Sequence, residues 1–276
     1  MGYYNSTVMR KIMIIALFLL MIGSVQAQTK YPTLIISTNY GEMKAILYDD
    51  TPNHSDHFLK LVKQGYFDGT LFHRVLREFM IQGGAQDSKN APAGVQIGGG
   101  RTDMDILPEF RDHHFHKKGA LAAPRRDDNV NPQKKSDASQ FYIVHGKVYT
   151  PGRLDSMEMK VNVPIKNKII REHYMPHKEK LDELKTTDAS AFNNLLDSLL
   201  SVVDSLYEAA PDKFFLREDL KEIYSTTGGS HHLDGEYTVF GEVIGGLDVI
   251  DKIANLAVDD YSRPKNDAKI IRIYTE

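Results

Sequence analysis

The sequence predicts a mainly β fold, a closed β-barrel interrupted by one α-helical insertion. Two observations predict it. Short runs with apolar residues at alternating positions, separated by turn residues, occupy both ends of the chain and are typical of β-barrels. Between them the chain is charged, and its apolar residues recur every three or four positions, which indicates helices. We therefore expect one β domain at residues 33–274 with a helical insertion at residues 150–229.

The first 27 residues are expected to be a signal peptide. Arg10 and Lys11 precede the apolar run IMIIALFLLMIG, and small residues stand at Val25 and Ala27. This order is typical of a secretory signal, with cleavage after Ala27. A retained anchor is the alternative, but the run is short for a bilayer span, which needs about twenty residues. We expect an exported protein, periplasmic or secreted, without a stable membrane span after cleavage.

Composition narrows the classes of function. The 276 residues include 34 Lys and Arg, 37 Asp and Glu, and no Cys, with a net charge of −3. No basic stripe is interleaved with aromatic residues, so we expect no nucleic-acid partner. The absence of cysteine excludes disulfides, thiol nucleophiles and thiolate metal sites.

The first elements are a hairpin and a helix. The hairpin pairs Leu34–Ser37 with Glu42–Tyr48, because apolar residues alternate on both sides of a turn. A helix is predicted over residues 52–64, and Gly65 ends it in the left-handed conformation. Two short strands follow, at Phe72–Leu76 and Phe79–Gln82.

The glycine-rich segment at residues 83–100 is expected to be a surface loop, since it lacks the G-x-x-x-x-G-K-[ST] pattern of a phosphate-binding loop. Beyond it we predict one more helix, Gly246–Leu256. The remaining predicted strands are Gly119–Ala122, Gln140–Val144, Tyr237–Val243 and Lys269–Tyr274.

The insertion is predicted to contain three helices. One covers residues 165–184 and is interrupted at Pro176. A second begins after Asp188, a plausible N-cap. A third opens at Pro211 and ends at Gly228. The second helix carries a single apolar stripe: Phe192, Leu195, Leu196, Leu199, Val202, Val203 and Leu206.

Strand parity gathers unusual polar residues on one barrel surface. Alternate residues of a strand share a face, so Met80 joins Gln82, and Gln140 joins Tyr142. Phe79 has the opposite parity unless a turn at Arg77 and Glu78 resets it. With Arg74 and Tyr237 added, the surface is an apolar patch with guanidinium and amide donors, and it has no evident nucleophile, base or metal triad.

Four motifs in order carry a family resemblance: FHRVLREFMIQGG, GALAAPR, SQFYIV and LDGEYTVFGEV. Together they resemble the cyclophilin-type peptidyl-prolyl isomerases over residues 33–149 and 230–274. The resemblance implies an eight-stranded antiparallel barrel closed by two helices. It also implies an isomerase that acts on proline-containing polypeptides without a cofactor.

The resemblance also assigns roles to residues. It implies that Arg74 is catalytic with Gln82 beside it, and that Gln140 is a further polar contact to the substrate backbone. The pocket walls would be Phe79, Met80, Tyr142 and Leu233. Other substrate-binding positions depart from the familiar pattern. Pro124 and Arg125 stand where many members carry Ala-Asn, and Tyr237 replaces a frequent histidine. Beside these positions, His232 stands where the tryptophan associated with tight cyclosporin binding is found.

The chemistry of prolyl isomerisation suits such a surface. Rotation about an X–Pro bond is slow because amide resonance must be lost, a barrier of roughly 20 kcal/mol. In the twisted transition state the nitrogen regains a lone pair, which a guanidinium N–H of Arg74 would bind. No proton is transferred. A surface pairing of Arg74 with Glu78 or Asp68 is the structural alternative.

Two other functions stay open from sequence. The protein could be a non-catalytic proline-peptide binding module or chaperone that uses the same pocket. It could instead be an assembly protein that acts through its helical insertion. We expect the insertion to border the substrate groove and to contact the client or a partner protein, without contributing to bond rotation.

The histidines raise the question of a metal site. His113, His114 and His116 are close in sequence, as are His231 and His232. Adjacent residues of a strand point to opposite faces, and no carboxylate stands at a recognised ligand spacing. We therefore expect ordinary surface histidines and no metal.

Overall fold

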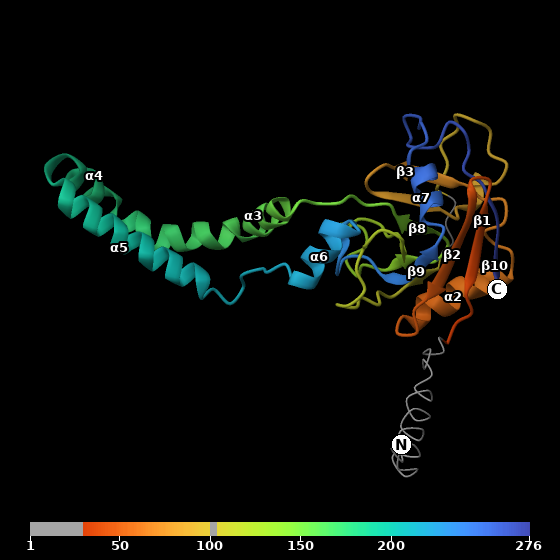
Figure 1. The fold of residues 1–276 in the computed structure, drawn as a ribbon, viewed down its shortest axis with the longest axis horizontal. Coiled ribbons are helices and arrows are strands. Elements are labelled where there is room, and N and C mark those ends of the chain that lie inside the picture. The colour runs from red at the N-terminus through yellow and green to blue at the C-terminus, as the bar shows by residue number, and fades with distance from the viewer. Residues whose placement is uncertain (1–29, 100–103) are drawn as a thin grey trace, which may run out of the picture.

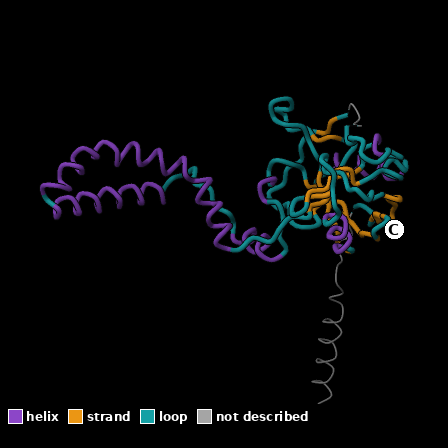
Figure 2. Tube along the Cα trace, turned by 90° about the horizontal axis from the view of Figure 1, so that it is seen from above, coloured by secondary structure: helices purple, strands orange, loops and turns teal. Residues whose placement is uncertain are grey.

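The computed structural model describes residues 30–99 and 104–276. The predicted signal peptide at residues 1–27 lies outside the described residues, as does Gly100 at the end of the glycine-rich segment. Figures 1 and 2 show a β body from which a long helical arm projects. None of the helices in the described ranges is long and apolar enough to cross a membrane.

Eight strands form one antiparallel sheet in the order β10-β1-β2-β9-β6-β8-β4-β3, so the predicted strand number and pairing sense are confirmed. A separate pair, β5 (Asp105–Ile106) and β7 (Ser136–Asp137), was not predicted. The strands of the main sheet are β1 Leu34–Thr38, β2 Gly41–Leu47, β3 Phe72–Leu76, β4 Met80–Gly83, β6 Ala120–Ala122, β8 Phe141–Val144, β9 Val239–Gly245 and β10 Ile270–Thr275.

The predicted closure of the barrel is wrong. The sheet curls into an open half-barrel, and its edge strands β3 and β10 share only an isolated bridge at Leu71 and Lys269, just before each strand. The reason lies in the irregular segment that leads into β10. The Val75 N–H donates to the Ser262 carbonyl at 2.8 Å, so a loop occupies the edge of β3 where a closing strand would pair.

Two helices cap the half-barrel, as predicted. They are α2 (Pro52–Lys63) and α7 (Leu247–Ala254), and both bury apolar faces in the main core. Gly65, with φ of 63°, ends the first of them in the left-handed conformation. A short 3-10 turn, η1 (Gln86–Ser88), follows β4.

Alternation along β8 separates the two faces of the sheet. Phe141 and Ile143 point into the main core between the sheet and the capping helices. Tyr142 and Val144 point the other way, into a second apolar cluster that also holds Met80. The functional surface is therefore built on the outer face of the sheet, over a small core of its own.

The segment between β8 and β9 is helical. It contains α3 (Pro151–Ile169), a π-helical turn η2 (Ile170–Tyr174), the 3-10 turn η3 (Met175–His177), α4 (Lys178–Thr187), α5 (Ala189–Glu208) and α6 (Glu218–Thr226). A last 3-10 turn, η4 (His231–Leu233), leads back to the sheet. Pro176 does interrupt the helix predicted at 165–184, and Asp188 caps α5 by accepting from two backbone N–H groups. Pro211 does not begin a helix; α6 begins only at Glu218.

We use the name arm for residues 158–213, which run out along α3 and return along α5 (Figure 1). The apolar stripe of α5 is only partly covered: Leu199 and Val203 are buried, whereas Val202 and Leu206 are exposed. A pair of antiparallel helices can hide only their facing sides, so the rest of the stripe remains in contact with water.

Candidate functional site

One row of residues crosses the sheet and sets the site. Arg74 of β3 pairs with Gln82 of β4, Gln82 pairs with Tyr142 of β8, and Tyr142 pairs with Ala122 of β6. Residues directly opposite each other in antiparallel strands share a face of the sheet. Register alone therefore gathers residues that are far apart in sequence, and it places the guanidinium at one end of the row.

Around this row lies a cavity of about 510 Å³. It collects the sequence-predicted site residues with a single exception, Gln140, and it adds His232. Gln140 instead lines a neighbouring cavity of about 210 Å³, which shares Gln82, Pro124 and Arg125 with the first. The residues that line the larger cavity are Arg74, Phe79, Met80, Gln82, Pro124, Arg125, Tyr142, His232, Leu233 and Tyr237.

The turn between β3 and β4 resolves the parity of Phe79. Glu78 adopts a left-handed φ of 62°, and the Phe79 N–H donates to the Leu76 carbonyl at 3.0 Å. Phe79 therefore lies in the turn, just before the strand begins at Met80. Both of these side chains reach the cavity, and Phe79 stacks on His232 with ring centroids 5.5 Å apart.

A chain of hydrogen bonds orients the polar groups. Arg74 Nη1 donates to Gln82 Oε1 at 3.3 Å, and Gln82 Nε2 donates to Gln140 Oε1 at 2.9 Å. Gln140 Nε2 then donates to the Gly98 carbonyl at 3.0 Å. Gly98 has φ of 102°, and a Cβ there would lie 2.6 Å from the His73 ring, so only glycine fits. The chain fixes both amides with Gln82 Oε1 facing the guanidinium.

Within the part of the chain that the structure describes, the Arg74 side chain donates only to Gln82, which leaves most of its donors available to a ligand. Among the described residues, no carboxylate lies within ion-pair distance of its guanidinium, so the pairing with Glu78 or Asp68 does not occur. Partial desolvation by the cavity walls lowers the pKa of Arg74, while Tyr237 acts in the opposite direction. Because arginine titrates far above neutral pH, the group stays charged.

The opposite wall is a stacked pair. The Arg125 guanidinium lies over the Tyr237 ring, 4.6 Å from its centroid. Glu236 holds that guanidinium in place, since Arg125 Nε donates to its carbonyl at 2.7 Å and Nη2 to its Oε2 at 2.9 Å. Arg125 is therefore a rigid part of the wall, and Pro124 precedes it along the rim.

Behind the cavity lies a chain of hydrogen bonds, buried except at Asp234, that sequence reasoning missed. The Tyr142 hydroxyl lies 2.9 Å from His116 Nε2, and His116 Nδ1 lies 2.9 Å from Asp234 Oδ1. The hydroxyl of Tyr224, in α6, donates to Asp234 Oδ2. Burial lowers the pKa of His116, although Asp234 acts against it, and burial raises the pKa of Tyr142 well above its ordinary value. We call these four residues the relay. Long-range contacts of this kind leave no local sequence signal.

A serine, histidine and glutamate also line up, but they cannot act on a substrate. His54 Nε2 lies 2.9 Å from Ser136 Oγ, and His54 Nδ1 lies 2.6 Å from Glu109 Oε2. All three side chains are buried, with Ser136 only 1% exposed. Glu109 also accepts from the Asn53 and His54 backbone N–H groups, so the arrangement anchors the start of α2.

The cavity can therefore bind and polarise rather than transfer protons. Its walls are aromatic and aliphatic. Its polar groups include the two guanidinium groups, the His232 imidazole, an amide oriented by the chain of hydrogen bonds, and a hydroxyl whose partner lies behind it. Such a surface suits a small apolar ring joined to a polar backbone. It offers hydrogen bonds to a group that gains electron density during a reaction.

Comparisons with known proteins agree with this geometry. The family described as "Cyclophilin type peptidyl-prolyl cis-trans isomerase/CLD" matches residues 33–170 and 221–275, and this match omits residues 171–220. A Staphylococcus haemolyticus protein named "Putative peptidyl-prolyl cis-trans isomerase" is 28% identical over 240 residues, covering 87% of this chain and 88% of that protein. A Streptococcus pyogenes protein named "Putative bifunctional phosphatase/peptidyl-prolyl cis-trans isomerase" is 28% identical over 246 residues.

The match to the streptococcal protein covers 87% of this chain but 37% of that protein, so the chain spans little more than a third of its length. Among solved structures, a Cryptosporidium parvum cyclophilin type peptidyl-prolyl cis-trans isomerase in the presence of the dipeptide Ala-Pro has a TM-score of 0.50 and 17% identity. It covers 88% of this chain and 98% of that chain. This structural match supports the fold. Because the family model covers more than half of the sequence, the chain belongs to the cyclophilin-type peptidyl-prolyl cis-trans isomerase family.

Proposed function

We propose that this protein accelerates cis–trans rotation about X–Pro bonds in polypeptides, and that the cavity around Arg74 is where it does so. The single observation that carries the proposal is the placement of the Arg74 guanidinium, which has no carboxylate partner among the described residues, beside a cavity of about 510 Å³ with aromatic and aliphatic walls. An arginine without a carboxylate partner at such a site is poised for a substrate group. The family that the chain belongs to supports the same reaction.

The proposed mechanism uses differential hydrogen bonding. In the planar ground state the prolyl nitrogen shares its lone pair with the carbonyl, and a donor gains little from approaching it. As the bond twists, the nitrogen becomes pyramidal, and an Arg74 N–H can bind the recovered lone pair. Only interactions that strengthen in the transition state accelerate the step. Gln82 holds the guanidinium in position through its oxygen.

The walls have a separate task in this proposal. Phe79, Met80, Tyr142 and Leu233 would hold the proline ring, which is apolar and matches the cluster beneath the cavity. The neighbouring cavity would receive the residues adjacent to the proline, because it shares Gln82 with the first. A substrate lying across both cavities would pass Gln140, whose amide is already oriented.

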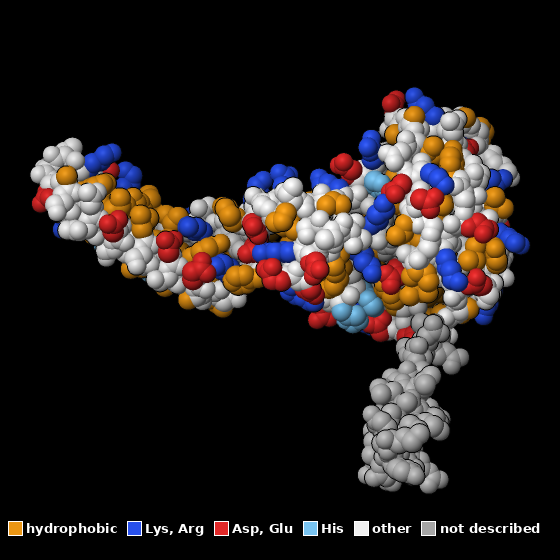
Figure 3. Space-filling view, viewed as in Figure 1, with side chains coloured by type: hydrophobic (Ala, Val, Ile, Leu, Met, Phe, Trp, Pro, Cys, Tyr) orange, Lys and Arg blue, Asp and Glu red, His pale blue; other side chains and the backbone are white. Residues whose placement is uncertain are grey.

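The clients are proposed to be exported polypeptides. The basis is the signal-like order of residues 1–27, which is typical of proteins that leave the cytoplasm. The arm is proposed to contact these clients, because it carries exposed apolar residues that an isolated pair of helices cannot cover. These residues are Met159, Val161, Val163, Leu200, Val202 and Leu206. Figure 3 shows hydrophobic side chains on the surface of the arm.

A protease-coupled isomerisation assay on a short X–Pro peptide tests the proposal. The expected result is an observed rate that rises linearly with protein concentration above the uncatalysed rate. A non-catalytic binding module would give a saturable peptide-binding signal without acceleration. Binding without acceleration by well-folded protein would therefore replace the isomerase with the module, and an assembly protein would show neither.

A further inference from the structure

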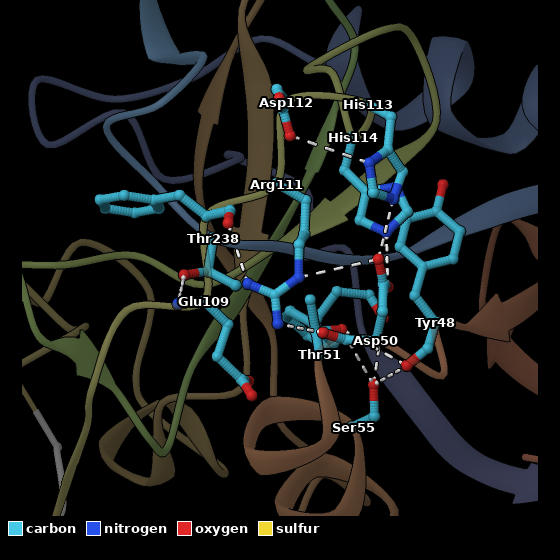
Figure 4. A network of polar contacts seen from close by, with 12 residues as sticks. Tyr48, Asp50, Thr51, Ser55, Glu109, Arg111, Asp112, His113, His114 and Thr238 are labelled. Carbon is cyan, nitrogen blue, oxygen red and sulfur yellow. Dashed lines mark hydrogen bonds and ion pairs between the residues drawn. The ribbon is translucent and has the colours of Figure 1, made fainter.

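A histidine pair converges on one carboxylate at the side of the β body. His113 Nε2 lies 2.8 Å from Asp50 Oδ2, and His114 Nε2 lies 2.7 Å from Asp50 Oδ1. The ligand atoms of the three residues all lie within 4.8 Å of one another. Figure 4 shows both imidazoles reaching the carboxylate from the same side.

The sequence argument against this pairing assumed a strand. Adjacent residues of a strand point to opposite faces, but Asp112 and His113 form a turn that carries His114 directly after it. The two rings are therefore neighbours, with centroids 4.3 Å apart. Asp50 comes from far away in the chain, in the turn after β2, so no sequence spacing could reveal it as the third member.

The surroundings hold these three groups in place. The His114 ring stacks on Tyr48 at 3.9 Å, and His113 Nδ1 lies 4.0 Å from an oxygen of Asp112. The Asp50 carboxylate is the nearer acceptor for both rings, so in the metal-free protein each Nε2–H donates to it, and a bound ion would take the place of these two protons. Arg111 anchors the Asp50 segment by donating to its carbonyl.

We propose that Asp50, His113 and His114 form a binding site for one divalent transition metal ion, Zn²⁺ or a close analogue. Two imidazole nitrogens and one carboxylate oxygen are ligands that zinc accepts at distances near 2.0–2.2 Å, and the three ligand atoms are already close enough together to surround one ion. His113 is exposed, so water completes the coordination. Calcium and magnesium prefer oxygen ligands and do not suit this set.

Arg111 limits the affinity. Its Nε lies 3.7 Å from Asp50 Oδ2, so a cation at the site meets a neighbouring positive charge. The guanidinium reaches the carboxylate from a different side than the two rings, which leaves the space between Asp50 and the imidazoles to the ion (Figure 4). We expect binding in the micromolar range rather than tighter.

A bound ion would tie two distant segments of the chain. Asp50 follows β2, whereas His113 and His114 lie about sixty residues later and lead to His116 of the relay. The same turn contacts the helical segment, because Arg217 Nη1 donates to the Asp112 carbonyl at 3.0 Å. The site therefore stands where the β body meets α6, and its expected role is to stabilise that junction.

The test is calorimetric titration of ZnCl₂ into chelator-treated full-length protein, followed by thermal unfolding with and without the metal. We expect one Zn²⁺ per chain, a rise in Tm with Zn²⁺, and no comparable effect of Mg²⁺ or Ca²⁺. Asp50→Asn and His114→Ala should weaken Zn²⁺ binding at least about tenfold. His113→Ala should do the same, and because His113 is exposed this variant keeps its fold.

His173→Ala is the matched control, since His173 is an exposed histidine of the arm. It should bind Zn²⁺ with the same stoichiometry and affinity as the unchanged protein. Absence of saturable binding at micromolar Zn²⁺ would overturn the proposal. So would equal weakening by His113→Ala and His173→Ala, which would mean that Zn²⁺ binds surface histidines indiscriminately.

Discussion

The helical segment between β8 and β9 contains two regions that relate to the β body in opposite ways. α6 is bound to the body: the buried Tyr224 reaches Asp234 of the relay, and the Tyr149 N–H donates to the Tyr224 carbonyl at 2.9 Å. The arm is not. Within the described residues, its hydrogen bonds and ion pairs stay inside the helical segment, as between Lys166 and Asp204 at 3.6 Å.

The helical segment is therefore not one structural unit. The family match includes the C-terminal part of α6 and omits residues 171–220, which lie mostly in the arm. Asn162 marks the division, because its side chain exchanges hydrogen bonds with the Phe214 backbone where the two chains of the arm meet. We therefore keep the expectation of no contribution to bond rotation for the arm alone. For α6, the relay favours a supporting role.

The largest effect is expected in the β body. Arg74→Ala should lower kcat/KM for a tetrapeptide about a hundredfold or more, because a donor present only in the transition state is lost. Arg74→Lys should recover little, since an ammonium cannot reproduce the planar guanidinium. The measurement is the protease-coupled assay on both variants.

Arg77→Ala is the matched control, because Arg77 is exposed three residues away and does not line the cavity. It should retain the unchanged rate. A folded Arg74→Ala protein with full activity would rule out the proposed mechanism, and the cavity in the β body would then no longer be the candidate catalytic centre.

A smaller effect is expected from α6. Tyr224→Phe removes the hydroxyl that binds Asp234 and leaves a partly buried carboxylate oxygen without that partner, which costs about 1 kcal/mol of stability. Because Tyr142 rests on the same relay, kcat/KM should also fall, by about threefold to tenfold. Both quantities are measured well below Tm, so that unfolding does not account for the loss.

Tyr207→Phe is the control in the arm, where the ring lies near Lys166 and Lys213 but not near the β body. It should leave both stability and kcat/KM within error. Equal losses in the two variants would show that α6 has no special relation to the cavity. A loss of stability without a loss of kcat/KM would make Tyr224 purely structural.

The arm should matter for protein clients. We expect that replacing residues 167–206 with a short Gly/Ser linker slows catalysed refolding of a proline-limited protein about twofold to fivefold, because exposed apolar contacts to the client are lost. Lys166 Nζ lies 5.3 Å from the Tyr207 ring, so a short linker can join the two ends. Unchanged refolding catalysis would deprive the arm of a client role.

The stability of the β body should depend on pH, because this part of the protein contains the buried histidines His73 and His116. Burial lowers the pKa of His73 to about 4 from an ordinary value of 6.5, and it lowers that of His116. Well above pH 6.5 both histidines are neutral in the folded and in the unfolded protein. As pH falls toward 4 the unfolded chain binds protons that the folded protein resists, so stability decreases.

Activity should respond differently over the same range. Between pH 6 and 8, kcat/KM should vary less than about threefold, since no titrating group transfers a proton. Denaturant unfolding from pH 4 to 8 measures stability, and peptide assays from pH 6 to 8 measure kcat/KM. A bell-shaped activity profile in folded protein would point to a histidine in the step, with His232 at the cavity as the first to substitute.

Local features of the sequence predicted much of the fold. Alternation located the eight strands of the main sheet, helical periodicity located α2, α5 and α7, and Asp188 was identified as a cap because capping is decided by neighbouring residues. Nine of the ten predicted site residues line one cavity, since strand parity and the family motifs fix which face they share. Their roles in catalysis stay predictions.

The remainder depends on contacts between distant segments. The half-barrel stays open because the loop at Ser262 occupies the edge of β3. No local pattern around Val75 or Ser262 predicts that these two residues pair. The relay joins residues 116, 142, 224 and 234, and the pair of histidines meets Asp50 only through a turn. α6 was misplaced because Pro211 resembles a helix start, although the helix begins seven residues later.

The most direct test compares two proteins on one tetrapeptide: the variant that lacks residues 167–206 and the Tyr224→Phe variant. The cavity and the relay are intact in the first and disturbed in the second. We predict that removing most of the arm leaves kcat/KM within about twofold of the unchanged protein, while loss of one hydroxyl lowers it more. A folded arm-deleted protein that loses as much activity as Tyr224→Phe, or more, would contradict the account.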